Sequence, residues 1–263
     1  MNIYVNKKIE KNFIKNGFHI QKVENFSFLK KIEKIIYESL KKKVKFKHKN
    51  IQDFFNNFHK EVDEKNINSL RLGLIENILS KKIFKDYYYE ICKKTLETIV
   101  GNELVMQKGI NLSIQLPNDE TSLLTMHADT WSGDSPYEAV IWLPLVNCYK
   151  SKSMYILPAN KYHYFEDSFR TQSNKSSDNI FKKIKRHVKW IDIKFGEFLI
   201  FNQTLPHGNV VNKESETRFS MNCRFKSVFS PYGSKGIGDF FEPISLKPIT
   251  KIAMDYELPR LKK

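Results

Sequence analysis

Three side chains that can bind a transition metal stand at two places in the second half of the sequence. His127 and Asp129 are two residues apart, and His207 follows 78 residues after Asp129. Two imidazoles and one carboxylate can hold Fe(II) on one face and leave the opposite face open for oxygen and a second ligand. The same donors could bind zinc with a fourth position left for water, so the three residues alone do not choose the metal.

The residues that follow the second histidine favour iron. Arg218 lies eleven residues after His207, and Ser220 is two residues further on. An arginine presents a planar fork that matches a carboxylate, and a serine on the same strand face adds one more hydrogen bond. A hydrolytic zinc site has no need of such an anchor. An iron enzyme that uses 2-oxoglutarate needs one, because this co-substrate chelates the metal at one end and presents a free carboxylate at the other.

The segment around Arg218 reads as a long strand with two unlike faces. Alternation predicts that the polar face lines a ligand-holding interior and that the apolar face packs against helices. The alternative is that the polar face is exposed at the edge of a sheet. The polar face carries Arg218, Ser220, Asn222, Arg224 and Lys226, and the apolar face carries Phe219, Met221, Cys223 and Phe225.

The elements that must position these residues change in character near residue 101. Before it, helical spacing of apolar residues predicts a short helix that ends at Asn16-Gly17 and turns into a strand, and then further helices. After it, β-prone runs alternate with turn residues, which predicts a mainly β jelly-roll or cupin-like barrel buttressed by the helices. The helices are expected over 27–43, 67–79 and 84–99, and the strands over 103–116, 122–127, 137–147, 153–157, 187–193, 197–203, 207–211 and 217–229.

Length and composition favour one soluble, intracellular domain. With 263 residues, 41% of them hydrophobic, the chain can bury a sizeable core. We expect a single domain with a mostly helical part (1–100), a jelly-roll core (101–230) and a C-terminal tail (231–263). The three cysteines lie far apart without metal-type spacing, and no apolar run resembles a secretion signal or a membrane span. These features predict a cytoplasmic location.

The net charge of +15 raises the question of a nucleic-acid partner. Only six of the 44 basic residues are arginines, and the lysines are spread along the chain. The charge is therefore expected to favour anionic small molecules in general rather than nucleic acid. In a chain where lysine is the usual cation, arginines close behind His207 are less easily explained as surface residues.

Several segments together resemble one family. The chain is similar to the Fe(II)/2-oxoglutarate-dependent oxygenases, in particular to the phytanoyl-CoA-hydroxylase-like branch. The sequence has Ala159-Asn160 after Pro158, where these proteins usually have a Pro-Gly-Ser-His turn. The resemblance covers most of the chain and is weak before residue 100. It rests on Asn16-Gly17-Phe18, His127–Trp131, Val140–Val146, Met154–Asn160, Phe201–Gly208 and Thr217–Ser220.

The resemblance implies an activity and roles for individual residues. His127, Asp129 and His207 would bind Fe(II), and Arg218 with Ser220 would bind 2-oxoglutarate. With O2, the co-substrate would be decarboxylated to succinate while a C–H bond of a small substrate is hydroxylated. A halogenase is disfavoured, because such enzymes replace the carboxylate that Asp129 supplies. Further co-substrate contacts are expected from Asn111 and Gln115.

The substrate is expected to be small and polar or anionic. The stretch 131–136 resembles oxygenases encoded among bacterial surface-carbohydrate genes, which suggests a sugar or a nucleotide sugar. Candidate substrate contacts are Trp131, Trp142, Tyr162 and Arg224, although each aromatic residue could serve only the core. The polar segment 158–186 is expected to form a lid or substrate loop.

Two other functions stay open. Arg218 and Arg224 have the Arg-x5-Arg spacing found in oxygenases that dealkylate nucleic acids. Against that reading stand the Trp-Leu-Pro-Leu segment and the long separation between Asp129 and His207. The chain could also be a cupin-like binding protein without turnover, although the complete set of metal ligands argues against it.

Overall fold

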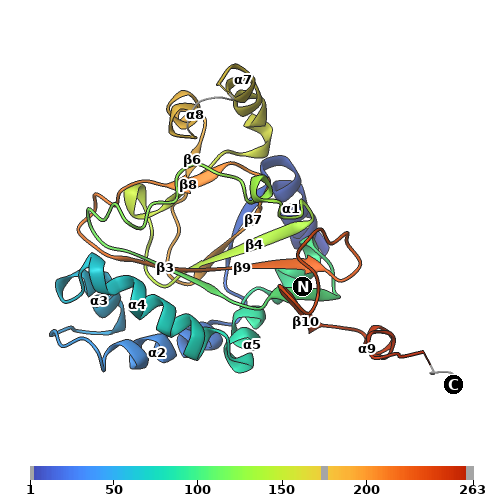
Figure 1. Ribbon diagram of the computed structural model, residues 1–263, viewed down its shortest axis with the longest axis horizontal. Helices are drawn as coiled ribbons and strands as arrows, with labels where there is room; N and C mark the ends of the chain where they lie inside the picture. The colour runs from blue at the N-terminus through green and yellow to red at the C-terminus, as the bar shows by residue number, and fades with distance from the viewer. Residues whose placement is uncertain (1–2, 173–176, 259–263) are drawn as a thin grey trace, which may run out of the picture.

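A computed structural model describes residues 3–172 and 177–258. Helices cover one face of a seven-stranded sheet, and a smaller three-stranded sheet lies over the opposite face (Figure 1). Strands in both sheets pair antiparallel. The large sheet has the order β1-β7-β4-β9-β2-β10, with β3 also paired to β9, and the small sheet has the order β6-β5-β8. The expected mainly β architecture with a helical buttress is confirmed, but the two sheets do not join into a closed barrel.

The chain begins with the expected helix-to-strand turn. Helix α1 (Ile3–Asn16) ends before Gly17, and strand β1 (Phe18–Lys22) pairs with β7 (Glu197–Asn202). Gly17 has a φ of +74°, in the left-handed region where L-residues are strained. A Cβ at this position would also lie 2.5 Å from the Leu205 side chain. Glycine is therefore required by the turn, and any larger residue would also force the Leu205 side chain to move.

The other helices before residue 100 differ in detail from those expected. Side-chain oxygens of Asn25, Asn50 and Asp63 cap three helix starts. The region expected as one helix over 84–99 is two, because the backbone leaves helical geometry at Cys92. A π-helical turn (Ile75–Leu79) extends one helix, and α3 was not expected. The helices are α2 (Phe26–Leu40), α3 (Ile51–Asn56), α4 (Glu64–Leu74), α5 (Lys82–Glu90) and α6 (Lys93–Ile99).

The central strand of the large sheet confirms the two-faced pattern. Strand β9 (Arg218–Ser227) lies between β4 (Glu138–Pro144) on one side and β2 (Leu104–Gln107) with β3 (Asn111–Gln115) on the other. It is therefore not an edge strand, and the alternative of an exposed polar face is wrong.

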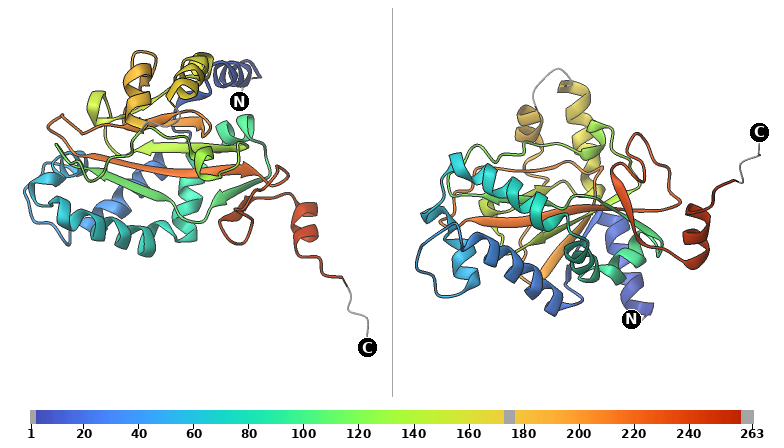
Figure 2. Two further views of the ribbon diagram at one scale, coloured as in Figure 1. Left: turned by 45° about the horizontal axis from the view of Figure 1, so that its top comes forward. Right: turned by 60° about the horizontal axis from the view of Figure 1, so that its bottom comes forward.

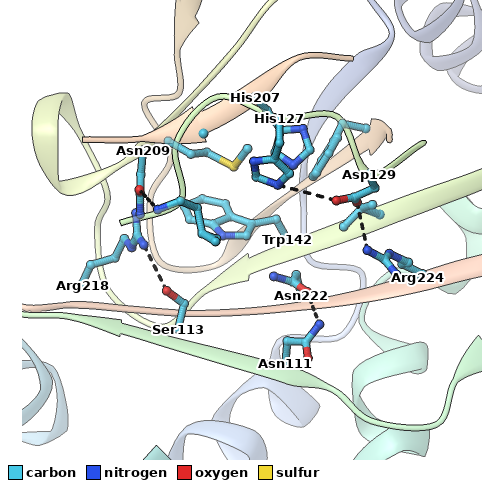
Figure 3. Close-up of a pocket in the computed structure, with 15 residues that line it drawn as sticks. Asn111, Ser113, His127, Asp129, Trp142, His207, Asn209, Arg218, Asn222 and Arg224 are labelled. Atoms are coloured by element: carbon cyan, nitrogen blue, oxygen red, sulfur yellow. Dashed lines mark hydrogen bonds and ion pairs between the residues drawn. The ribbon is translucent and has the colours of Figure 1, made fainter. Parts of the chain in front are cut away.

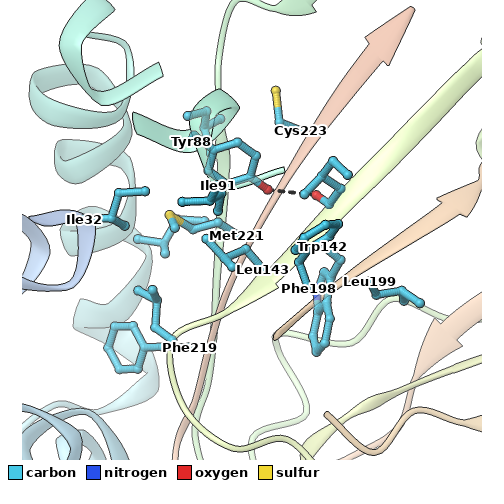
Figure 4. Packing of buried hydrophobic residues seen from close by; sticks show 14 of the residues in the cluster. Ile32, Tyr88, Ile91, Trp142, Leu143, Phe198, Leu199, Phe219, Met221 and Cys223 are labelled. Atoms are coloured by element: carbon cyan, nitrogen blue, oxygen red, sulfur yellow. Dashed lines mark hydrogen bonds between the residues drawn. The ribbon is translucent and has the colours of Figure 1, made fainter. Parts of the chain in front are cut away.

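The apolar face of β9 joins the sheet to the helices. The Phe219 ring packs against two rings of the helical part. Its centroid lies 4.8 Å from that of Phe55 and 5.1 Å from that of Phe58. The buried hydroxyl of Tyr88 donates a hydrogen bond of 2.8 Å to the Ile141 carbonyl of β4 (Figure 4). Burial of these side chains supplies the main stabilising contribution, and the polar face of β9 is left free to line a cavity.

The small sheet carries the segment expected as a lid. It consists of β5 (Met154–Ile156), β6 (Lys189–Trp190) and β8 (His207–Asn209). The prediction of a polar loop over 158–186 is wrong, because helices α7 (Tyr162–Gln172) and α8 (Ser177–Ile184) form there. Phe165, Ile180 and Ile184 are buried in a second apolar cluster, which is why these segments are helical. Residues 173–176 of that predicted loop lie outside the described residues.

The C-terminal segment contributes one more strand. Strand β10 (Phe241–Ser245) pairs with β2, and α9 (Pro248–Met254) extends away from the body (Figure 2). Neither element was assigned from the sequence. Within residues 3–172 and 177–258, no helix has the length and apolar character needed to cross a bilayer.

Candidate active site

The two histidines meet through a main-chain bridge. His127 N donates to His207 O at 2.9 Å, and His207 N donates to His127 O at 2.8 Å. The prediction of a strand over 122–127 is wrong, since only this isolated bridge forms. A side-chain oxygen competes for the backbone there: Leu124 N bonds Asn209 Oδ1 at 2.7 Å rather than a backbone carbonyl of β8. The bridge nonetheless fixes the two imidazoles with ring centroids 4.4 Å apart.

The carboxylate reaches the histidines from a turn. Asp129 begins a 3-10 helix (Asp129–Ser132), and its N–H donates to Gln203 O at 3.1 Å. Asp129 therefore does not share a strand face with His127, as the spacing of two residues in a strand would predict, although Asp129 Oδ1 lies 3.6 Å from His127 Nε2. Ligand atoms of His127, Asp129 and His207 lie within 4.8 Å of one another (Figure 3). The three side chains could hold one metal ion.

The Nδ1 atoms of both imidazoles are already bonded. His127 Nδ1 bonds Thr125 O, and His207 Nδ1 bonds Leu205 O, each at 2.8 Å. A carbonyl accepts only from a protonated nitrogen, so each neutral ring presents Nε2 as its free ligand atom. Burial, and next the nearby His127, lower the pKa of His207 to about 4. At neutral pH His207 is therefore unprotonated at the atom that faces the cluster.

Arg224 forms an ion pair with Asp129, the carboxylate of the group. Its Nη2 lies 3.3 Å from Asp129 Oδ2, and its Nη1 lies 3.3 Å from Asp134 Oδ1. Asp134 also forms an ion pair with Lys235. The Asp129 carboxylate is thus turned so that one oxygen faces Arg224 and the other faces His127, which leaves one oxygen for a metal.

Arg218 lies deep in the site without a carboxylate partner. Its Nη2 donates to Ser113 Oγ at 3.0 Å and its Nη1 to Ser153 O at 3.4 Å. Arg218 as a whole is 3% exposed, and within residues 3–172 and 177–258 its Nε has no hydrogen-bond partner. The buried hydroxyl of Ser220 also lacks one. Buried polar groups are nearly always paired, so unpaired donors beside a cavity point to a missing acceptor.

One cavity of about 250 Å³ connects these groups. His127, Asp129, His207, Arg218 and Arg224 all line it. Trp142, a candidate substrate contact, also lines the cavity, and side chains of both sheets take part (Figure 3).

The remaining predicted site residues are placed less uniformly. Asn111 lines the cavity, and its amide donates to Asn222 Oδ1 at 2.9 Å. Gln115 and Ser220 are buried beside Arg218 but are not among the lining residues, and Gln115 Nε2 donates to Val210 O. Neither Trp131 nor Tyr162 lines the cavity. Trp131 is 45% exposed and stacks on Phe165, and the Phe165 ring also contacts that of Tyr162.

Two polar residues of the site were not picked out from the sequence. Ser113 accepts a hydrogen bond from Arg218, and Asn209 fixes the segment before His127. Ser113 stands between Asn111 and Gln115 on the same face of β3, so strand alternation could have revealed it. Asn209 has the same relation to His207 on β8.

Comparisons with known proteins relate the chain to one group of folds. No family model matches it, and no curated protein matches its sequence. Solved structures do match. A non-heme monooxygenase, the ThoJ–Ni complex, has a TM-score of 0.57 at 12% identity, over 94% of this chain and 93% of its own.

Two further structures have similar scores. EctD from S. alaskensis with 2-oxoglutarate and 5-hydroxyectoine matches with a TM-score of 0.56 at 11% identity, over 88% of this chain and 78% of its own. The non-heme alpha ketoglutarate dependent epimerase SnoN from nogalamycin biosynthesis matches at 0.52 and 11% identity, over 90% and 89%. The chain therefore has the fold of solved non-heme, 2-oxoglutarate-dependent enzymes, among which the reactions differ.

Proposed function

We propose that the protein is an Fe(II)/2-oxoglutarate-dependent oxygenase of the phytanoyl-CoA-hydroxylase-like branch, and that its two sheets are the halves of a double-stranded β-helix. One observation carries the proposal. A cluster of two imidazoles and one carboxylate shares a cavity with a buried arginine that has no carboxylate partner. A dicarboxylate that chelates a metal at one end needs a cation for the carboxylate at its other end, and the Arg218 guanidinium could supply it.

The donor set fits iron. Two neutral imidazole nitrogens and one carboxylate oxygen match the facial triad of non-heme Fe(II) enzymes. The main-chain carbonyls that accept from Nδ1 orient both rings and raise the basicity of Nε2. Arg224 leaves one oxygen of Asp129 toward the cluster. All three side chains line one cavity, so a metal held by them would have room there for further ligands.

The buried arginine fits 2-oxoglutarate. A carboxylate beside Arg218 would accept from Nε, which has no other partner among the described residues, and the unpaired Ser220 hydroxyl lies on the same strand face. Ser113 and the Ser153 carbonyl hold the guanidinium in place for it. Charged hydrogen bonds of this kind contribute about 1.5–3 kcal/mol each.

The chain's own task is to position the reactants and to keep water out. Iron with 2-oxoglutarate and O2 would supply the oxidising chemistry. Phe201 packs edge-on against the His207 ring at 4.9 Å, and Trp142 and Val140 add apolar wall. These side chains lower the local dielectric around the ligands and strengthen their charge interactions. Asn111 and Asn222 supply polar groups on the same wall.

We further propose hydroxylation of a small polar substrate in the cytoplasm. The presence of Asp129 supports this over halogenation, which needs the carboxylate position vacated. The net charge of +15 supports a polar or anionic substrate, with a sugar or nucleotide sugar of surface-polysaccharide biosynthesis as the first class to test.

The decisive experiment is succinate formation by the purified full chain given Fe(II), 2-oxoglutarate and O2. His127→Ala is expected to abolish it, because one of three ligands is lost. His163→Ala, which replaces an exposed histidine of α7, is the matched control and should behave as wild type. Retained turnover in His127→Ala would remove the metal assignment.

The same assay tests the alternative of nucleic-acid dealkylation. Methylated DNA and RNA are expected not to stimulate consumption of 2-oxoglutarate. The substrate that the enzyme hydroxylates should stimulate it. Clear stimulation by methylated oligonucleotides would instead support the dealkylase reading of the Arg218–Arg224 spacing. A panel of nucleotide sugars, with mass spectrometry to detect the gain of one oxygen, identifies the substrate.

A further inference from the structure

A second, larger cavity opens directly beside the first. It has a volume of about 560 Å³ and lies along strand β3, between α4 and the segment 121–124. Four residues line both cavities: Asn111, Ser113, Leu124 and Asn222. The larger cavity therefore adjoins the smaller one that holds the candidate metal ligands.

The wall shared by the two cavities is polar and well fixed. Asn111 Nδ2 donates to Asn222 Oδ1 at 2.9 Å, and each amide keeps one further polar group that this bond does not use. Leu124 is held to Asn209 by two hydrogen bonds, from its own N–H to the side chain and from Asn209 N to its carbonyl. The shared wall thus offers both hydrogen-bond donors and acceptors at a defined place.

Arg71 of α4 lines the larger cavity and is not among the residues that line the smaller one. Its guanidinium bonds only neutral groups: Asn68 Oδ1 at 2.8 Å and, weakly, Leu112 O at 3.4 Å. Glu64 lines the same cavity, but no ion pair within 4.0 Å joins Arg71 to a carboxylate in the part of the chain that the structure describes. Arg71 is half-buried, so its charge is less screened than that of the many exposed lysines.

We propose that the two cavities together form the substrate site and that Arg71 binds an anionic oxygen group of the substrate, a phosphate or a carboxylate. The polar middle of the substrate meets Asn111 and Asn222, and the reacting carbon lies at the end formed by His127, Asp129 and His207. This rests on the proposed oxygenase function and deepens it by naming the substrate class. Arginine suits the role because its planar fork bonds two oxygens at once.

Binding of simple anions to the metal-free full chain tests the proposal by calorimetric titration. Pyrophosphate and citrate are the probes, one for each chemical source of the charge. Wild type is expected to bind at least one of them, more weakly as NaCl is raised. Arg71→Gln should weaken that binding roughly 2- to 5-fold, the effect of one partly exposed charge pair, and Arg71→Lys should weaken it less.

Arg186→Gln is the matched control, because it removes another arginine with a different setting, hydrogen-bonded to His187 near α8. It should bind the probe as wild type does. Equal affinity in wild type and Arg71→Gln, an equal loss in Arg186→Gln, or no binding of either probe by wild type would overturn the proposal. Far-ultraviolet circular dichroism checks that each variant is folded.

The two proposals fail separately. Anion binding is measured without metal, and succinate formation by wild type is measured without pyrophosphate or citrate. Succinate formation without Arg71-dependent binding would leave the oxygenase and remove this substrate site. Arg71-dependent binding without succinate formation would leave the anion site and remove the oxygenase.

Discussion

At the scale of single residues, the two arginines of β9 share a strand face but have different partners. Arg218 is buried against Ser113 and Ser153 and has no carboxylate beside it, whereas Arg224 already bonds Asp129 and Asp134. From the sequence, Arg224 is a candidate substrate contact. Its ion pairs suggest a different role, which is to orient the candidate metal ligand Asp129.

The first prediction concerns the co-substrate. Arg218→Ala should raise the 2-oxoglutarate concentration needed for half-maximal succinate formation about 10- to 100-fold, since it removes a charged hydrogen-bonded anchor of about 1.5–3 kcal/mol. Arg224→Ala should change that concentration far less. Steady-state assays over a range of 2-oxoglutarate concentrations measure both. The opposite order would move the anchor to Arg224.

The second prediction concerns the metal. Without its Arg224 partner, Asp129 can rotate, so Arg224→Ala should weaken anaerobic Fe(II) binding, whereas Arg218→Ala should not. Losing an outer partner of a metal ligand typically costs 10- to 100-fold in affinity or activity. Arg224→Lys keeps the charge and should recover part of the affinity. Unchanged Fe(II) affinity in Arg224→Ala would show that the ion pair does not orient Asp129.

At the scale of elements, strand β8 places His207 only because Gly208 follows it. A Cβ on Gly208 would lie 2.6 Å from Tyr155 Oη and 2.8 Å from Leu124 O. The second contact is with backbone, so the strand itself must shift. Gly208→Ala is expected to reduce the free energy of unfolding by about 1–3 kcal/mol and to weaken Fe(II) binding with it. Urea unfolding and metal titration measure the two effects.

Gly73 in helix α4 supplies the comparison. A Cβ there meets nothing within 4 Å, and its backbone is helical. Gly73→Ala should therefore stabilise the protein by about 0.5–1 kcal/mol, because alanine has the higher helix propensity. If Gly208→Ala were equally harmless, the close approach of β8 to Leu124 would not constrain the site.

The element scale also shows what could be predicted from sequence. Alternation in β9 and the Asn16-Gly17 turn were predictable, because both depend on local periodicity and backbone preference. The turn at Asp129 and the irregular path before His127 were not, because side-chain caps such as Asn209 come from remote strands. His127, Asp129 and His207 still come together, and their binding of iron stays a prediction. Helices α7 and α8 escaped notice because their buried stripe is short.

At the scale of the whole molecule, the helical part and the sheet share one core. Phe219 of β9 packs between Phe55 and Phe58, and Thr217 Oγ1 accepts a hydrogen bond from His59 N at 3.2 Å. Burial continues from these rings to the apolar face of the large sheet (Figure 4). The helices thus support the strand whose other face carries Arg218 and Arg224. A substitution that weakens this interface should therefore destabilise both the helical part and the sheet.

The last prediction is that both parts unfold together. All three tryptophans lie after residue 100, so their fluorescence reports on the β part, while most of the helix signal in circular dichroism comes from before it. The two urea curves should coincide. Phe219→Ala should lower the free energy of unfolding by about 3–5 kcal/mol and shift both curves equally. Phe229→Ala, which truncates a ring that is 71% exposed, should shift neither by more than about 0.5 kcal/mol. Separate curves, or a shift in only one of them, would make the helical part an independent folding unit and would remove the reason for β9 to depend on it.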